Sequence, residues 1–177
     1  QGWVKTIKNS IAQIAPHYTM KRQLDDYYHK FYDKLGKRSA MLAANDYAKA
    51  KEIAAWKEAV VEKWDSIEMV SMDKSEDAAQ GVLESGMEYN ITCVIDEKGL
   101  EDAIGLELVA IYTAADGKQH VYSVSPFKVV KREGNLYTFR LNEKIDTAGS
   151  FKIAYRMYPK HPDLPHRQDF CYVRWFV

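Results

Sequence analysis

The chain has 177 residues, 46% hydrophobic and 28% charged. It can therefore bury the core of at least one small domain and is not disordered as a whole. Its 25 basic and 25 acidic residues cancel, which argues against a nucleic-acid or membrane-surface role driven by global charge. Residues 1–66 carry 12 Lys and Arg against 8 Asp and Glu, whereas residues 67–177 carry 13 against 17. This asymmetry fits two separately built units, although ordinary scatter of surface charge explains it as well.

The first segment repeats apolar residues at helical spacing, namely Trp3, Ile7, Ile11 and Ile14. This stripe predicts a helix from Trp3 to Ala15, which Pro16 ends because the residue before a proline avoids the helical region. The chain also begins without an initiator Met. We therefore expect it to be a fragment of a longer protein.

A second helix is predicted from the six-residue stripe Leu24, Tyr27, Tyr28, Phe31, Tyr32 and Leu35. Thr19 is suited to cap its start, and Gly36 is suited to end it in a left-handed conformation. The stripe is mostly aromatic and carries three tyrosine hydroxyls, which suits a partly hydrated interface. Plain core packing explains the same pattern.

A third, long and Ala-rich helix is predicted from about Ser39 to Trp64. The alternative is a break at Asn45-Asp46, which would give two shorter helices instead. Three such helices do not obviously close a core among themselves. We interpret residues 1–66 as a helical arm that packs on something else.

From Ile67 onward, apolar residues alternate with polar ones, the period of strands with one buried face. Asp116-Gly117 and Glu133-Gly134-Asn135 mark hairpin turns, and Gly149 precedes another strand. Strands are also predicted near 67–72, 119–124, 127–131 and 170–176, and Asp73–Ser85 is predicted to be a loop or short helix. About eight short strands favour an immunoglobulin-like antiparallel sandwich over residues 67–177. The fold class is therefore α+β by segment.

The two cysteines, Cys93 and Cys171, both lie in apolar, strand-like runs. They are suited to pair across two sheets in a secreted protein, or to remain reduced core residues in a cytoplasmic one. The sequence has no signal peptide pattern and no apolar run of membrane-spanning length. We therefore expect reduced cysteines, a cytoplasmic location and no membrane partner.

No set of residues predicts a complete active site. His161 and His166 flank Asp163 in a proline-containing loop, but their spacing matches no common zinc arrangement, and a stiffened loop is the simpler interpretation. His17 and His29 lie in the helical part, and His120 lies in a strand. The sequence contains no Gly-rich phosphate loop and no nucleophile elbow. We assign no catalytic, cofactor-binding or metal-ligating residue.

Three stretches resemble the C-terminal end of glycogen and α-glucan phosphorylases. The first comprises Trp3–Ala12 and Tyr18–Tyr27, which resemble the last part of the catalytic region. The second is Asn45–Lys57 with Val60 and Trp64, and the third is Tyr158–Leu164 with Arg174-Trp175. The second and third are similar to the short bacterial branch of the family. Lys21 and Gln23 depart from the vertebrate pattern, which has an acid and a Thr at these places.

The resemblance implies a parent enzyme that uses pyridoxal phosphate to cleave α-1,4-glucans with inorganic phosphate, releasing glucose 1-phosphate. The cofactor lysine and the substrate contacts of that family lie upstream of this chain, so the fragment alone is expected to be inactive and to hold no cofactor. Its expected partner is the upstream catalytic region, against which residues 1–66 would pack.

Two further roles remain open for residues 67–177. The first is glucan binding, because sandwich domains bind sugars on aromatic platforms; the candidate contacts are Trp175, Tyr172, Tyr112, Tyr122 and Tyr158. Packing within the sheets explains the same aromatic residues. The second is a structural role in oligomerisation or in contacts between domains.

Overall fold

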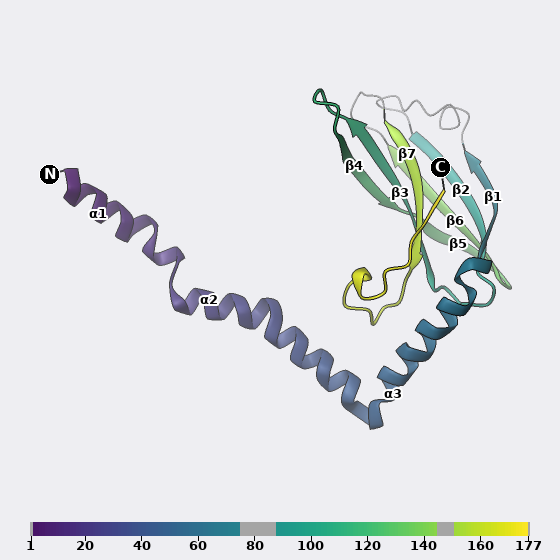
Figure 1. The fold of residues 1–177 in the computed structure, drawn as a ribbon, viewed down its shortest axis with the longest axis horizontal. Helices are drawn as coiled ribbons and strands as arrows, with labels where there is room; N and C mark the ends of the chain where they lie inside the picture. Colours follow the sequence, from purple (N-terminus) through teal and green to yellow (C-terminus); the bar gives the residue numbers. More distant parts are fainter. Residues whose placement is uncertain (1, 75–87, 145–150, 177) are drawn as a thin grey trace. The chain divides into compact units, whose positions relative to one another are not determined.

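The computed structural model describes residues 2–74, 88–144 and 151–176. The chain divides into two compact units, Gln1–Ala54 and Ala55–Val177. A helical region precedes two four-stranded antiparallel sheets, as Figure 1 shows. The α+β segmentation is thereby confirmed, while the domain boundary expected after Ser66 stays a prediction. No helix in the described parts of the chain is both long and apolar enough to cross a membrane.

The helical unit begins with α1 (Gly2–Gln13), the short 3₁₀ turn η1 (Ala15–His17) and α2 (Met20–Tyr27). These elements confirm the predicted first helix and its end near Pro16. The Thr19 side chain accepts a hydrogen bond from the Arg22 amide at 3.2 Å, so the predicted cap is also confirmed. Neither α1 nor α2 buries a residue.

The predicted helix end at Gly36 is wrong. The helix runs from α2 through the π-helical stretch η2 (Tyr28–Tyr32) into α3 (Asp33–Lys63), which contains Gly36. One glycine in a helix interior costs only about 1 kcal/mol relative to alanine. The neighbouring Asp33–Lys37 ion pair, at 2.8 Å, bridges one helical turn across it.

The alternative break at Asn45-Asp46 is confirmed. Within α3, Ala44 has ψ of 149°, and Asn45, Asp46 and Tyr47 have φ of 52°, 53° and 60°. Asn and Asp tolerate this left-handed conformation better than most residues, which explains why the helix divides here.

The first sheet has the strand order β1 (Glu68–Lys74), β2 (Glu88–Asp96), β6 (Leu136–Lys144) and β5 (Lys128–Glu133). The second has the order β4 (Gln119–Pro126), β3 (Ile104–Thr113), β7 (Lys152–Pro159) and β8 (Arg174–Phe176). Eight strands are thus present among the described residues. The β3–β4 and β5–β6 connections contain Gly117 and Gly134 at φ of 80° and 60°, which confirms both predicted hairpins.

The larger of two buried clusters among the described residues joins the two sheets. Cys93 and Phe139 are register partners in the first sheet, and Leu106 and Met157 are partners in the second; all four belong to one buried cluster. The end of the helical segment contributes Val60 and Trp64 to the same cluster, together with η3 (Trp64–Ser66) leading into β1. The last turns of α3 are therefore part of the β unit's core.

Several local predictions have different outcomes. Both cysteines are free, but only Cys93 is buried; Cys171 is exposed, so its assignment to the core is wrong. Cys171 lies in an irregular segment before β8, and only residues 174–176 of the predicted last strand form a strand. His120 lies in β4 as predicted. Most of the predicted Asp73–Ser85 connection and Gly149 lie outside the described residues.

Candidate functional site

Three of the five aromatic residues predicted to contact glucan come together around Arg156 of the second sheet. Trp175 of β8 is the register partner of Arg156 in β7, and Tyr158 lies two residues further along β7. Tyr158 and Tyr172 line one pocket together with Arg156. The structure thus assembles Trp175, Tyr158 and Tyr172 around Arg156.

The other two predicted aromatic residues do not join this group. Tyr112 stacks on His120, with ring centroids 5.4 Å apart, and Tyr122 packs on Phe151 at 4.7 Å. Tyr112 lies at the end of β3 near the hairpin, where its register partner is His120. Trp175 is paired with Arg156 at a different position of the sheet, so the two aromatic side chains do not form one ligand surface.

The polar centre of the group is Glu107, which the sequence analysis missed. Glu107 is the register partner of Arg156, so both side chains project from the same face of the sheet. Arg156 Nε donates to Glu107 Oε1 at 2.5 Å, and Arg167 Nη1 donates to both carboxylate oxygens at 2.8 and 3.1 Å. The Glu107 side chain is only 2% exposed. Two guanidinium groups therefore compensate one buried charge.

Each of these arginines also stacks on an aromatic ring. The Arg156 guanidinium lies 5.2 Å from the Trp175 ring centroid, and that of Arg167 lies 4.2 Å from the Tyr158 centroid. Tyr158 crosses Gly105, where a Cβ atom would come within 2.4 Å of the tyrosine ring. Burial raises the pKa of the Tyr158 hydroxyl. Trp175, Arg156, Glu107, Arg167 and Tyr158 form a continuous cluster, hereafter the arginine–aromatic cluster.

Arg167 reaches this cluster from the short 3₁₀ turn η4 (Arg167–Asp169). The His166 side chain accepts from the Gln168 amide, and the Asp169 carboxylate accepts from the His166 amide, both at 3.1 Å. This reciprocal cap fixes the turn and so orients Arg167 over the sheet.

The segment that carries η4 is anchored to the end of α3 within the same compact unit. Phe170 packs on Trp56 at 5.4 Å, and Tyr172 packs on Trp64 at 5.6 Å. Lys57 Nζ donates to the Asp169 carbonyl at 3.2 Å. Tyr172 is therefore part of an aromatic anchor and of the pocket wall at once.

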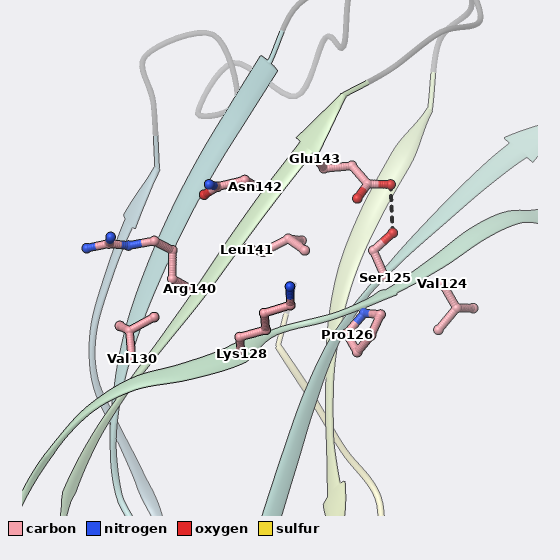
Figure 2. A pocket seen from close by; sticks show the side chains of 9 residues that line it. All are labelled: Val124, Ser125, Pro126, Lys128, Val130, Arg140, Leu141, Asn142 and Glu143. Atoms are coloured by element: carbon pink, nitrogen blue, oxygen red, sulfur yellow. Dashed lines mark hydrogen bonds between the residues drawn. The ribbon is translucent and has the colours of Figure 1, made fainter.

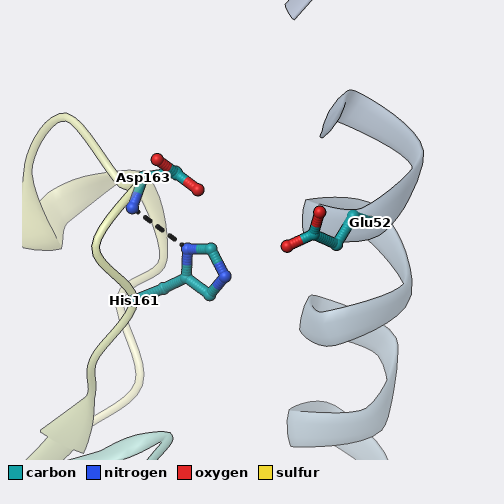
Figure 3. Close-up of side chains that lie close together, drawn as sticks. All are labelled: Glu52, His161 and Asp163. Atoms are coloured by element: carbon teal, nitrogen blue, oxygen red, sulfur yellow. Dashed lines mark hydrogen bonds between the residues drawn. The ribbon is translucent and has the colours of Figure 1, made fainter. Parts of the chain in front are cut away.

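The histidine loop has a simple local structure. The backbone amide of Asp163 donates to His161 Nδ1 at 3.1 Å, as Figure 3 shows. The His161 ring also lies 4.8 Å from the Trp56 ring. These contacts hold residues 161–163 as a compact turn beside Trp56, in agreement with the stiffened loop that the prolines indicate.

The protein family of the chain follows from comparison with known domain families. A model of the glycogen phosphorylase C-terminal domain matches residues 64–177. The chain belongs to this family. The resemblance to α-glucan phosphorylases is thereby confirmed, and the arginine–aromatic cluster lies within the matched domain.

Relatives of the C-terminal domain family extend the similarity over the helical unit. The chain is 26% identical to a maltodextrin phosphorylase of Thermococcus litoralis over 98% of its own length and 20% of that protein. It is 21% identical to a glycogen phosphorylase of Mycobacterium tuberculosis over 93% of its own length and 19% of that protein. The chain thus spans about a fifth of the length of the curated relatives it matches.

This member of the C-terminal domain family has two hollows of interest. One, of about 310 Å³, lies beside the arginine–aromatic cluster and includes Arg156, Tyr158, Arg167, Gln168, Phe170 and Tyr172 in its wall. A larger one, of about 520 Å³, lies where β4 approaches β5 and β6. Figure 2 shows its wall, where the Ser125 hydroxyl donates to Glu143 at 2.7 Å. No aromatic residue lines the larger hollow, whereas Tyr158, Phe170 and Tyr172 line the smaller one, which suits a ring-shaped ligand.

Sequence reasoning missed Glu107, Arg156 and Arg167. One signal was available, since Glu107 interrupts an otherwise apolar strand, and a buried acid needs a partner. The partners were not identifiable, because Arg156 and Arg167 lie 49 and 60 residues away in sequence.

Proposed function

We propose that this chain is the non-catalytic C-terminal portion of an α-glucan phosphorylase, an enzyme that degrades glycogen or maltodextrin with phosphate to glucose 1-phosphate. The observation that carries the proposal is the similarity to a maltodextrin phosphorylase over 98% of the chain. The family match over residues 64–177 supports the same assignment for the β part.

The helical unit would pack on the upstream catalytic region of the same enzyme. Its apolar stripes support this role, because Trp3 is 74% exposed, Ile11 64% and Tyr32 61%. Large apolar side chains gathered on one helix face mark interaction surfaces in soluble proteins. Self-association through the same stripes is the alternative. Light scattering of the chain over a tenfold concentration range separates the two, since a monomer at every concentration argues against self-association.

Pyridoxal phosphate would be held by that upstream region. A Schiff-base lysine is activated by desolvation or by a neighbouring cation. No lysine side chain is buried in residues 2–74, 88–144 or 151–176. The lysines of the described residues therefore lack the desolvated environment that can activate such a lysine.

The test uses two proteins. The chain alone, incubated with maltodextrin, phosphate and pyridoxal phosphate, is expected to release no glucose 1-phosphate. The longer protein that contains this chain is expected to release it. Turnover by the chain alone contradicts the non-catalytic role, and an inactive, correctly folded longer protein contradicts the phosphorylase assignment.

We also propose that the β unit is an immunoglobulin-like sandwich. The strand orders β1-β2-β6-β5 and β4-β3-β7-β8 support this, because they correspond to the ABED and C′CFG orders of that fold when the strands are lettered along the chain. We also propose a cytoplasmic location, where cysteines stay reduced. Both cysteines are free, and burial raises the pKa of the Cys93 thiol to about 12, which keeps it protonated and unreactive. Cell fractionation tests the location.

Glucan binding by the β unit is a second candidate function. The convergence of Trp175, Tyr158 and Tyr172 near Arg156 favours it, and Trp175 remains 48% exposed for stacking on a sugar. In glycogen-containing gels, the chain should be retarded, and Trp175→Ala should abolish the retardation. Tyr112→Ala is the matched control, because Tyr112 is 39% exposed but lies outside the cluster. Equal mobility with and without glycogen rules the function out.

A further inference from the structure

The pocket beside the arginine–aromatic cluster combines positive charge with aromatic walls. Arg156 and Arg167 line it together with Tyr158, Phe170 and Tyr172. Glu107, which compensates the two arginines, is buried and does not line the pocket. No other acidic residue of the described chain lines it either. A ligand entering the pocket therefore meets guanidinium groups without meeting a carboxylate.

Both arginines keep donors available to such a ligand. Arg167 uses Nη1 for its two bonds to Glu107, and Arg156 uses Nε and Nη2 for its contacts with the same carboxylate. Among the described residues, Arg167 Nε and Nη2 and Arg156 Nη1 make no hydrogen bond. The Arg167 and Arg156 side chains are 49% and 26% exposed, so both are partly accessible to solvent. Because Glu107 and the aromatic rings hold the guanidinium planes, little side-chain freedom remains to be lost on binding.

These features match a phosphate group attached to a small ring. Two guanidinium groups suit the several acceptor oxygens and the double negative charge of a phosphate monoester. The side chains of Tyr158, Phe170 and Tyr172 form a largely apolar wall against which a sugar ring can pack. The volume of about 310 Å³ lies at the small end of the range for ligand pockets, roughly 300–1,000 Å³. This size favours a monosaccharide over a nucleotide.

We propose that this pocket binds a sugar monophosphate, with the phosphate on Arg156 and Arg167 and the sugar against the aromatic wall. The proposal does not rest on the phosphorylase assignment, since it follows from the pocket alone. The pocket shares Tyr158 and Tyr172 with the proposed glucan surface, whereas Trp175, the residue that the glucan test replaces, does not line it.

Isothermal titration calorimetry of the chain with glucose 1-phosphate, inorganic phosphate, AMP and glucose tests the proposal. We expect saturable binding of glucose 1-phosphate, weaker binding of inorganic phosphate and AMP, none of glucose, and weaker binding at higher salt. Tighter binding of AMP than of glucose 1-phosphate overturns the sugar assignment. Equal binding of inorganic phosphate and glucose 1-phosphate overturns the role of the aromatic wall, and binding of none of the phosphates overturns the site.

Gln168 allows a charge test that leaves the Glu107 network intact. Gln168→Glu should weaken glucose 1-phosphate binding about fivefold and Gln168→Lys should strengthen it by a similar factor, as expected for one partly screened charge. Arg167→Gln should weaken binding about tenfold or more. Lys118→Gln is the matched control, because it removes a positive charge from the β3–β4 hairpin, which does not line the pocket. If Arg167→Gln unfolds the protein, the affinities of Gln168→Glu and Gln168→Lys for glucose 1-phosphate test the proposal instead. Identical affinities for the two Gln168 variants overturn the proposal.

Discussion

The two compact units use similar apolar patterns with opposite results. In α1, Trp3, Ile7 and Ile11 lie on one stripe and are 74%, 41% and 64% exposed. In β2, Ile91, Cys93 and Ile95 alternate with polar residues and are at most 1% exposed. A strand face finds its partner in the facing sheet, whereas a helix stripe depends on whatever lies opposite it. An amphipathic pattern thus predicts an apolar surface that packs against another element, but it does not identify that element.

Matched truncations in the two units give the largest expected contrast. Phe139→Ala should lower the free energy of unfolding by about 3–5 kcal/mol, because it empties a well-packed position in the core. Phe31→Ala should change it by less than about 0.5 kcal/mol, since Phe31 is 52% exposed. Urea unfolding followed by tryptophan fluorescence measures both. Comparable losses of unfolding free energy in the two variants would mean that Phe31 is buried in solution, and the contrast between the two units would then be wrong.

The β unit should also carry a pH dependence centred on Glu97. Burial raises the pKa of this carboxyl from 4.5 to about 7, and Glu97 Oε1 has no hydrogen-bond partner among the described residues. Between these pH values the folded state binds the proton more tightly than the unfolded state does. The free energy of unfolding should therefore fall as pH rises from 4.5 to 7, by about 3 kcal/mol in total.

Thermal unfolding at pH 5, 6, 7 and 8 measures this dependence. Glu97→Gln is the control, because it keeps the shape of the side chain and removes the charge. The variant should have a flatter profile and exceed the wild type in stability at pH 8. An unchanged slope would assign the pH dependence to another group.

Arg174 tests whether the end of the helical segment belongs energetically to the β unit. Its guanidinium donates to the Trp64 and Ile67 carbonyls at 2.6 and 2.7 Å. Arg174→Met should therefore cost about 2 kcal/mol, the value of hydrogen bonds made by a charged group. Amide hydrogen exchange should become faster in residues 55–66. Arg140→Met, on an exposed strand position, is the control, and equal effects of the two substitutions would argue against a specific connection.

The smallest effect is expected at the start of α2. Thr19→Ala removes the cap on the Arg22 amide and should destabilise this helix by about 1 kcal/mol, seen as lost ellipticity at 222 nm. The unfolding transition of the β unit should not move, because α2 contributes no residue to its core. Ser39→Ala, in the interior of α3, should not reduce ellipticity. A shift of the main transition by Thr19→Ala would show that the units unfold together.

Local sequence signals predicted most elements but only the aromatic part of the candidate site. The Thr19 cap, the Asn45-Asp46 break and the hairpins at Gly117 and Gly134 depend on a few neighbouring residues. Gly36 failed as a helix end because its cost is small beside the propensity of the residues around it. The site depends on strand register and on the η4 turn, which no local pattern specifies.

The sequence by itself determined the helical stripes, the alternation of the strands and the resemblance to phosphorylases, because these depend on residue type and short spacing. The tertiary structure alone decided that Glu107 is enclosed by Arg156 and Arg167. It also decided that Trp175 and Tyr158 join them while Tyr112 and Tyr122 do not. The reason is that a sheet brings residues together by hydrogen-bond register, so contacts across 49 or 60 residues exist only after the strands have paired.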